Sequence, residues 1–200
     1  MKKHPDQTTQ RKVYHDIHVH DDQQPVGMIK RFLAYLLDFY FGMLLCSLPI
    51  VLGNGILNGS EKMQMNLYFF DGATFYIVGL LSLLVGWLYY VYVPEHVWKG
   101  QTVAKHLMHI KIVKMNGEEV DGKTLFLRQI VGMFIVEGAV VSCSTIIRQM
   151  LTYSTSINFV DTFIYIGFGI TLISSVLMML TKKRRMLHDF IGTTKVIQAL

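Results

Sequence analysis

Four long apolar segments dominate the chain and limit what it can fold into. They cover about residues 32–52, 73–93, 125–145 and 162–180. Each is long enough to cross a hydrocarbon layer as a helix, which takes about 20 apolar residues. Because a membrane core offers no water to exposed backbone groups, helices are the expected structure of such segments. The sequence therefore predicts an all-α membrane protein built as a four-helix transmembrane bundle.

The composition agrees with this class and excludes several others. Apolar residues make up 52% of the chain and charged residues only 16%, whereas soluble domains typically carry about 25% charged residues. This excludes an ordinary soluble enzyme, a disordered chain and a disulfide-stapled secreted module. The two cysteines, Cys46 and Cys143, fall inside apolar segments and are expected to act as small apolar fillers.

Lysine and arginine residues outside the four segments alternate along the chain, with 6, 1, 5, 1 and 5 in successive connecting regions. Because positively charged loops stay in the cytoplasm, we predict a multi-pass protein of the cell membrane with both termini and the second loop cytoplasmic. This placement explains most of the net charge of +5, so no nucleic-acid partner is expected. The expected partners are the lipid bilayer and anionic headgroups, which Arg184 and Arg185 can bind.

Residues 1–27 are predicted to form a flexible polar cytoplasmic tail, followed by a membrane domain over residues 28–197. The tail has too few apolar residues to bury a core of its own. Its histidines, among them His18 and His20, form a tract of the kind that can bind Zn²⁺, Cu²⁺ or Ni²⁺. A flexible tail lacks the fixed backbone of a selective site, so a solvated tail without metal or cofactor is the favoured interpretation.

The second loop, residues 94–123, is long enough to have structure of its own. Thr102 is a predicted N-cap of a short helix, and imperfect alternation favours a strand over residues 109–115. Asn116-Gly117 is a strong hairpin signal, so we expect a short β-hairpin in this cytoplasmic loop. A similar apolar segment at residues 194–197 is expected to join the same small sheet.

Three charged residues fall at membrane depth, where an ionised group costs about 2.5–3.5 kcal/mol. At a helical rise of ~1.5 Å per residue, Asp38 lies about 9 Å and Arg128 about 4–5 Å from the cytoplasmic edge. We predict that these two pair or share a polar cluster. Glu137 lies about 18 Å deep with no basic residue at its level, so it is either protonated or beside a polar cavity.

These residues support two interpretations: a buried ion pair that holds helices in register, or a proton or cation relay. Asp189, which follows the fourth segment, either caps a helix or binds Arg31 at the cytoplasmic surface.

Sequence motifs of hydrolases, metalloproteases and nucleotide-binding proteins are missing from the chain. We therefore expect no catalytic residues and no enzymatic activity.

Three motifs in order resemble the RDD family of bacterial membrane proteins, which is named for one arginine and two aspartates. The first runs from Arg31 to Asp38, the second from Lys99 to Lys105, where Ala104 replaces the family's usual glycine, and the third contains Leu187-His188-Asp189. The resemblance covers about residues 28–197. It implies that Arg31, Asp38 and Asp189 are the naming residues, and that cation/proton antiport, proposed for some members, is an activity to consider.

Two functions are therefore expected as alternatives. The first is a proton- or monovalent-cation-coupled transporter with Asp38 and Glu137 as protonatable carriers, whose charge state Arg128 or Arg31 sets. The second is a non-transport membrane module that binds a protein partner or lipid through the cytoplasmic loop. Since four helices form a thin bundle for a pore, transport would need a homo-oligomer.

Overall fold

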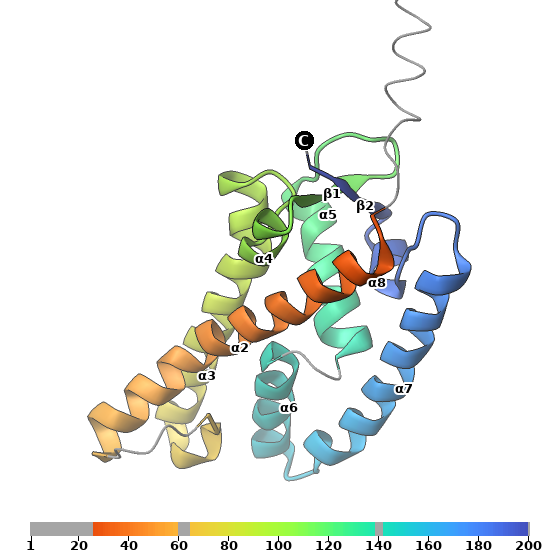
Figure 1. Cartoon of the computed structure of the whole chain (residues 1–200). Helices are drawn as coiled ribbons and strands as arrows, with labels where there is room; N and C mark the ends of the chain where they lie inside the picture. The colour runs from red at the N-terminus through yellow and green to blue at the C-terminus, as the bar shows by residue number, and fades with distance from the viewer. Residues whose placement is uncertain (1–25, 60–64, 139–141, 200) are drawn as a thin grey trace, which may run out of the picture.

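The computed structural model of the chain describes residues 26–59, 65–138 and 142–199. Most of the predicted tail, including its histidine tract, lies outside this part. Within it, three helices are long and apolar enough to cross a membrane, and a bent pair of helices makes a fourth span if it is counted as one. Figure 1 shows the long helices below a small two-stranded sheet, with the C-terminus beside that sheet. The predicted helical membrane fold is confirmed.

Three spans follow the apolar segments closely. Helix α2 covers Met28–Asn58 and contains Pro49 without ending there. Helix α3, Gly72–Trp87, continues directly as the π-helix η2, Leu88–Val97, so that the second span has 26 residues. Helix α7 covers Phe159–Leu180. The helices extend beyond the predicted segments because polar residues at their ends can still continue the backbone hydrogen bonds.

The third apolar segment is not one straight helix in the described residues: two helices bent by 60° lie there, which make either a broken span or a re-entrant loop. Helix α5, Gly122–Leu125, leads directly into the π-helix η3, Phe126–Glu137. Helix α6, Ser142–Thr155, then continues at an angle of 60°. Gly138 ends η3 with a left-handed backbone, φ 38°, which glycine adopts at little steric cost. Hydropathy does not detect such a change of direction, so the sequence predicted one uninterrupted span.

Short elements form the end of the molecule that carries the sheet, which we call the sheet end. Helix α4, Val103–Leu107, is capped by Thr102, whose Oγ1 accepts a hydrogen bond from Lys105 N. Strand β1, Ile110–Lys114, pairs antiparallel with β2, Thr194–Gln198, as the sequence predicted. The expected return strand of the hairpin is reduced to one isolated bridge between Val113 and Glu119.

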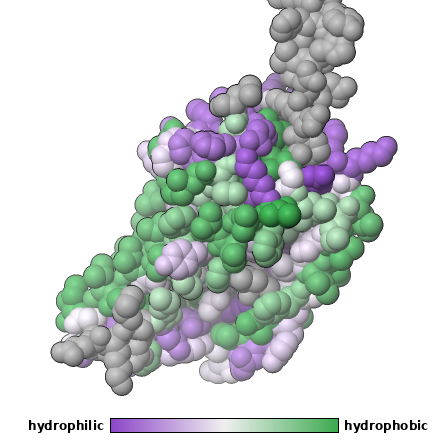
Figure 2. All heavy atoms as spheres, in the orientation of Figure 1, coloured by the Kyte–Doolittle hydropathy of each residue, from purple (hydrophilic) through white to green (hydrophobic). Residues whose placement is uncertain are grey.

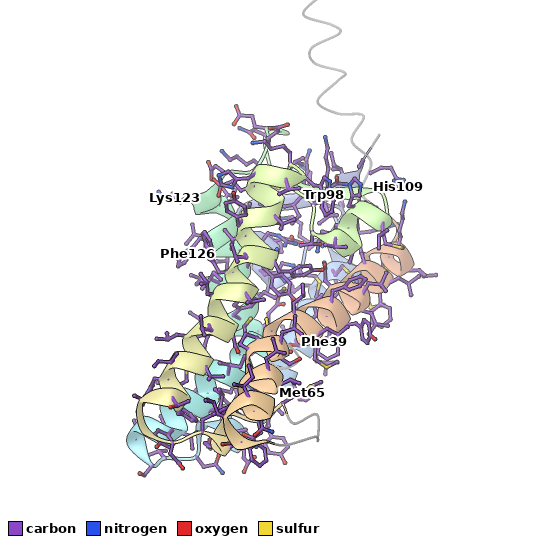
Figure 3. The ribbon with its side chains drawn as sticks, turned by 90° about the vertical axis from the view of Figure 1, so that its left-hand side faces the viewer. Phe39, Met65, Trp98, His109, Lys123 and Phe126 are labelled. Atoms are coloured by element: carbon purple, nitrogen blue, oxygen red, sulfur yellow. The ribbon has the colours of Figure 1, made fainter. Side chains whose placement is uncertain are left out.

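Two further short helices connect the longer elements. Helix α8, Leu187–Ile191, follows α7 and leads into β2. The 3-10 helix η1, Leu67–Phe69, lies between α2 and α3. Figure 3 shows Trp98, His109 and Lys123 at the sheet end and Met65 at the opposite end.

The surface has the polarity expected of a membrane protein. Figure 2 shows hydrophilic side chains gathered at the sheet end above a broad hydrophobic region. Large apolar side chains on α7 are strongly exposed, among them Leu180 at 76% and Tyr165 at 77%. An apolar surface of this extent is unfavourable in water and favourable in lipid.

The core between the spans contains both cysteines. Their sulfur atoms, on α2 and α6, lie 3.2 Å apart as a thiol–thiol contact. They pack against Gly86 of α3, where an added Cβ would come within 2.3 Å of Cys143 Sγ. Three spans therefore meet at this point, and the cysteines fill the space between them as small apolar groups.

This contact allows a direct test of the helix arrangement. A mild oxidant such as copper–phenanthroline in air should join Cys46 to Cys143 within one chain, because the chain has no other cysteine and these sulfur atoms are already in contact. The measurement is maleimide labelling after denaturation, which should find both thiols blocked in the monomer. The C46S variant is the control and should keep Cys143 reactive. Two reactive thiols in the oxidised wild type would contradict the packing of α2 on α6.

Candidate functional site

The carboxylate of Asp189 lies at the centre of a buried ion cluster. Its Oδ2 accepts a hydrogen bond from Arg31 Nη2 at 2.6 Å, and its Oδ1 accepts from Arg128 Nη2 at 2.8 Å and Nε at 3.1 Å. Oδ2 also accepts from the backbone N of Met186 at the start of α8. Both roles that the sequence left open for Asp189, helix capping and binding Arg31, are therefore present. The contacts join α2, η3 and α8.

Two glycines allow α8 to lie directly against η3. A Cβ on Gly132 would come within 2.8 Å of His188 Cβ, and a Cβ on Gly192 within 2.6 Å of Arg128 Cβ. At such distances the backbones would have to separate. Asp189, at 0% exposure, is consequently sealed from solvent between the two elements.

The surroundings of Asp189 keep it ionised. Burial by itself would raise the pKa of this carboxyl, but the positive charges of Arg128 and Arg31 outweigh that effect and hold the pKa well below its usual range. Asp189 is therefore a fixed anion of the fold and is not suited to carry a proton at neutral pH.

Asp38 belongs to a second set of contacts. Its Oδ2 accepts a hydrogen bond from Lys105 Nζ, and its Oδ1 accepts one from Tyr89 Oη at 2.8 Å. Of the two arrangements predicted for Asp38 and Arg128, a direct pair or a shared polar cluster, the direct pair is not among the described contacts, because Arg128 binds Asp189. Helix α4 places Lys105 beside the spans, which an argument restricted to residues inside the spans could not foresee.

Lys105 is held in an unusual environment for a lysine. Burial lowers the pKa of its ammonium group, and the positive charge of Arg128 lowers it further. The Asp38 carboxylate raises the pKa but does not outweigh burial, so the pKa of Lys105 is lower than that of an exposed lysine. Lys105 was quoted in the family motif, but the sequence argument gave it no role at the site.

Glu137 has a partner that sequence reasoning also missed. Its Oε2 lies 2.8 Å from His188 Nδ1, and its Oε1 accepts hydrogen bonds from His188 N at 3.0 Å and Ser174 Oγ at 2.5 Å. His188 reaches this depth because α8 folds back against η3. The other ring nitrogen of His188 lies 3.7 Å from Asp189 Oδ1, so the two clusters adjoin.

One small cavity is lined by Asp38 and Lys105 of one set of contacts and by Arg31, Arg128 and His188 of the others. It has a volume of about 30 Å³ and is bordered by residues of α2, η2, α4, η3 and α8, together with the sheet. A water molecule needs about 10–15 Å³ of such space, so the cavity has room for about two. Asp38 and Arg128 both border this cavity. The polar side chains that line the cavity are Arg31, Tyr35, Asp38, Tyr90, Lys105, Arg128 and His188.

The arrangement brings acidic and basic side chains within hydrogen-bond distance of one another. Within the described ranges, no group of three or more His, Cys, Asp or Glu side chains is placed to hold a metal ion. The site instead combines three acidic side chains, Asp38, Glu137 and Asp189, with basic partners that each lie within hydrogen-bond distance.

Comparison with known proteins places all of these residues inside one matched region. The sequence pattern of the RDD family matches residues 25–193. The uncharacterized protein YckC of Bacillus subtilis (strain 168) is 27% identical over 177 residues, which is 88% of this chain and 86% of YckC. No solved structure matches the chain.

The ion cluster gives a prediction for stability. Asp189→Asn removes the anion that Arg31 and Arg128 share, and breaking a buried pair in this way typically costs about 3–5 kcal/mol. We expect a corresponding loss in the free energy of unfolding in detergent. Asp121→Asn is the matched control, since it removes an exposed carboxylate bound to Lys114 and should have a far smaller effect. Equal losses in the two variants would contradict a central role for Asp189.

The low pKa of Asp189 also predicts a pH dependence. A carboxyl whose pKa is lower in the folded state contributes stability above its unfolded pKa, about 3.9, and loses it as pH falls toward the folded pKa. The difference in stability between wild type and D189N should therefore be constant from about pH 5 to about pH 8 and shrink below about pH 4. Chemical unfolding at each pH measures it. A stability difference that does not shrink below about pH 4 would contradict the lowered pKa of Asp189.

Proposed function

The chain belongs to the RDD family, and on that premise we propose that this integral membrane protein couples the movement of a monovalent cation to that of a proton. The observation that carries the proposal is the small cavity between the spans, with Asp38 on one side and the Glu137–His188 pair adjoining another. Ionisable groups at membrane depth are costly, and those beside internal water commonly mark ion or proton pathways.

Asp38 is the proposed cation site. Its carboxylate is bound to Lys105, whose pKa burial lowers, so Lys105 releases its proton more readily than an exposed lysine. When Lys105 is neutral, a monovalent cation can take its place at the Asp38 carboxylate. One proton leaves as one cation binds, and the charge of the site is unchanged.

The buried charges favour such an exchange. Arg31, Arg128 and Lys105 carry three positive charges, and Asp38, Asp189 and Glu137 carry three negative charges when ionised. A balanced set of this kind tolerates replacement of one cation by another better than the addition of a net charge. Because Asp189 stays ionised, it holds Arg31 and Arg128 in place while Lys105 changes its protonation.

The Glu137–His188 pair is the proposed second proton site. An imidazole can both accept and donate a proton, and His188 borders the cavity while its Nδ1 contacts Glu137. Ser174 donates to the same carboxylate, which keeps Glu137 oriented toward α8. A proton released near Lys105 thus has an acceptor across a cavity large enough for water.

We also propose the orientation and assembly of the protein. The second loop and the C-terminal strand share the sheet end, so one side of the membrane carries both. The distribution of lysine and arginine favours the cytoplasm for that side and the cell membrane as the location. Because four spans make a thin bundle, a homo-oligomer is the proposed working form.

Flux in proteoliposomes tests the proposal. With an imposed K⁺ or Na⁺ gradient, the wild type should dissipate a pH difference across the membrane, and D38N should not, because it lacks the carboxylate that binds the cation. E137Q should slow the exchange by removing the second proton site. D121N removes an exposed carboxylate that does not line the cavity and should behave as wild type. Equal flux in D38N and wild type would reject the proposed transport.

The alternative function, a partner-binding module, is favoured by one observation. Leu107 of α4 and Val97, the last residue of η2, are both more than half exposed. If these side chains bind a protein partner, L107Q should abolish its co-purification without changing the fold, whereas D38N should have no effect. If the protein is instead a transporter, D38N should lose flux and L107Q should keep it. The two variants therefore separate the two functions.

A further inference from the structure

A second cavity lies apart from the ion cluster, between η3, α6 and α7. Its volume is about 390 Å³, within the range of about 300–1,000 Å³ that is typical of small-ligand sites. Its walls are mostly aromatic and aliphatic, with Phe134, Phe159 and Phe163 among them. Ser144 and Arg148 are the polar residues among the described side chains that line it.

Arg148 is a buried cation without a buried anion. It is 8% exposed, and its Nη2 donates to the backbone O of Gly138 at 2.5 Å. In the described ranges no carboxylate forms an ion pair with it. Ser144, whose hydroxyl donates to Phe134 O, is neutral and cannot balance the charge of Arg148. Since an unpaired buried charge is strongly unfavourable, the cavity lacks a negatively charged group.

We propose that this cavity binds an anionic phospholipid, with the phosphate at Arg148 and part of an acyl chain along the apolar wall. A guanidinium binds phosphate oxygens in a bidentate manner, and Arg148 uses one of its five N–H donors on Gly138. The wall includes Phe163 and Ile166 of α7, which are about 43% and 51% exposed. A lipid can therefore enter from the bilayer.

A second copy of the chain fits the same surface less well. Helix α7, which borders the cavity, contains one acidic residue, Asp161, in its first turn, and that side chain already binds Asn158. The exposed apolar face of α7 thus offers no carboxylate to another copy's Arg148. A lipid phosphate supplies the missing charge together with an apolar chain.

Native mass spectrometry of the detergent-purified full chain tests the proposal with two lipids of equal acyl chains, phosphatidylglycerol and phosphatidylcholine. The wild type should bind phosphatidylglycerol at least about tenfold more tightly, as expected for a charge-assisted contact in a buried site. R148Q should abolish this preference, and R148K should retain part of it because the charge remains. Ile147→Trp keeps Arg148 but fills the cavity, and it should weaken phosphatidylglycerol binding too.

K182Q is the matched control, since it removes an exposed positive charge at the other end of α7 and should leave the preference unchanged. Circular dichroism verifies that each variant is folded. Equal binding of both lipids by the wild type, or an unchanged preference in R148Q, would overturn the proposal. So would a dimer that persists after complete removal of lipid and that Ile147→Trp dissociates, because a second copy would then occupy the cavity.

Discussion

A single carboxylate, that of Asp189, ties the beginning, the middle and the end of this chain together. Arg31 reaches it from the first span and Arg128 from the third, while Asp189 itself belongs to the short helix after the fourth. Arg185 donates a hydrogen bond to the backbone O of Asp189. The Cζ of Arg185 lies 4.0 Å from the centroid of the Phe190 ring. The position of α8 in turn brings His188 to Glu137 and delivers β2 to β1. The candidate site and the sheet both depend on this one buried interaction.

The site is also built on two π-helical segments. The π-helix η2 supplies Tyr89 and Tyr90, whose hydroxyls bind the side chain and the backbone of Asp38. The π-helix η3 carries both Arg128 and Glu137. Long π-helical stretches are rare, and single π-bulges occur frequently at functional sites. Here the wider turn changes the direction of side chains relative to an α-helix, and polar groups on three elements converge.

The sequence predicted the spans well because lipid imposes a simple requirement on length and polarity. It also predicted Thr102 as a cap and the pairing of residues near 110 with residues near 196, since turn and strand signals are local. The partners of Asp38 and Glu137 were not predictable in the same way. Lys105 and His188 come from short segments outside the spans that fold back onto them, and depth along a helix says nothing about such segments. The break at Gly138 depends on backbone conformation, which hydropathy does not report.

The pairing of β1 with β2 has a consequence for how the protein is made. The strand at Ile110–Lys114 leaves the ribosome before α6 and α7 have been synthesised, while its partner, Thr194–Gln198, follows both of them in the chain. Until β2 has been synthesised, β1 lacks its partner strand. Arg31 likewise lacks its ion-pair partner until Asp189 has been synthesised. The sheet end can therefore close only after α7 and α8 have been synthesised. A nascent chain arrested just before residue 189 would contain every described span but would lack Asp189, the carboxylate that binds Arg31 and Arg128.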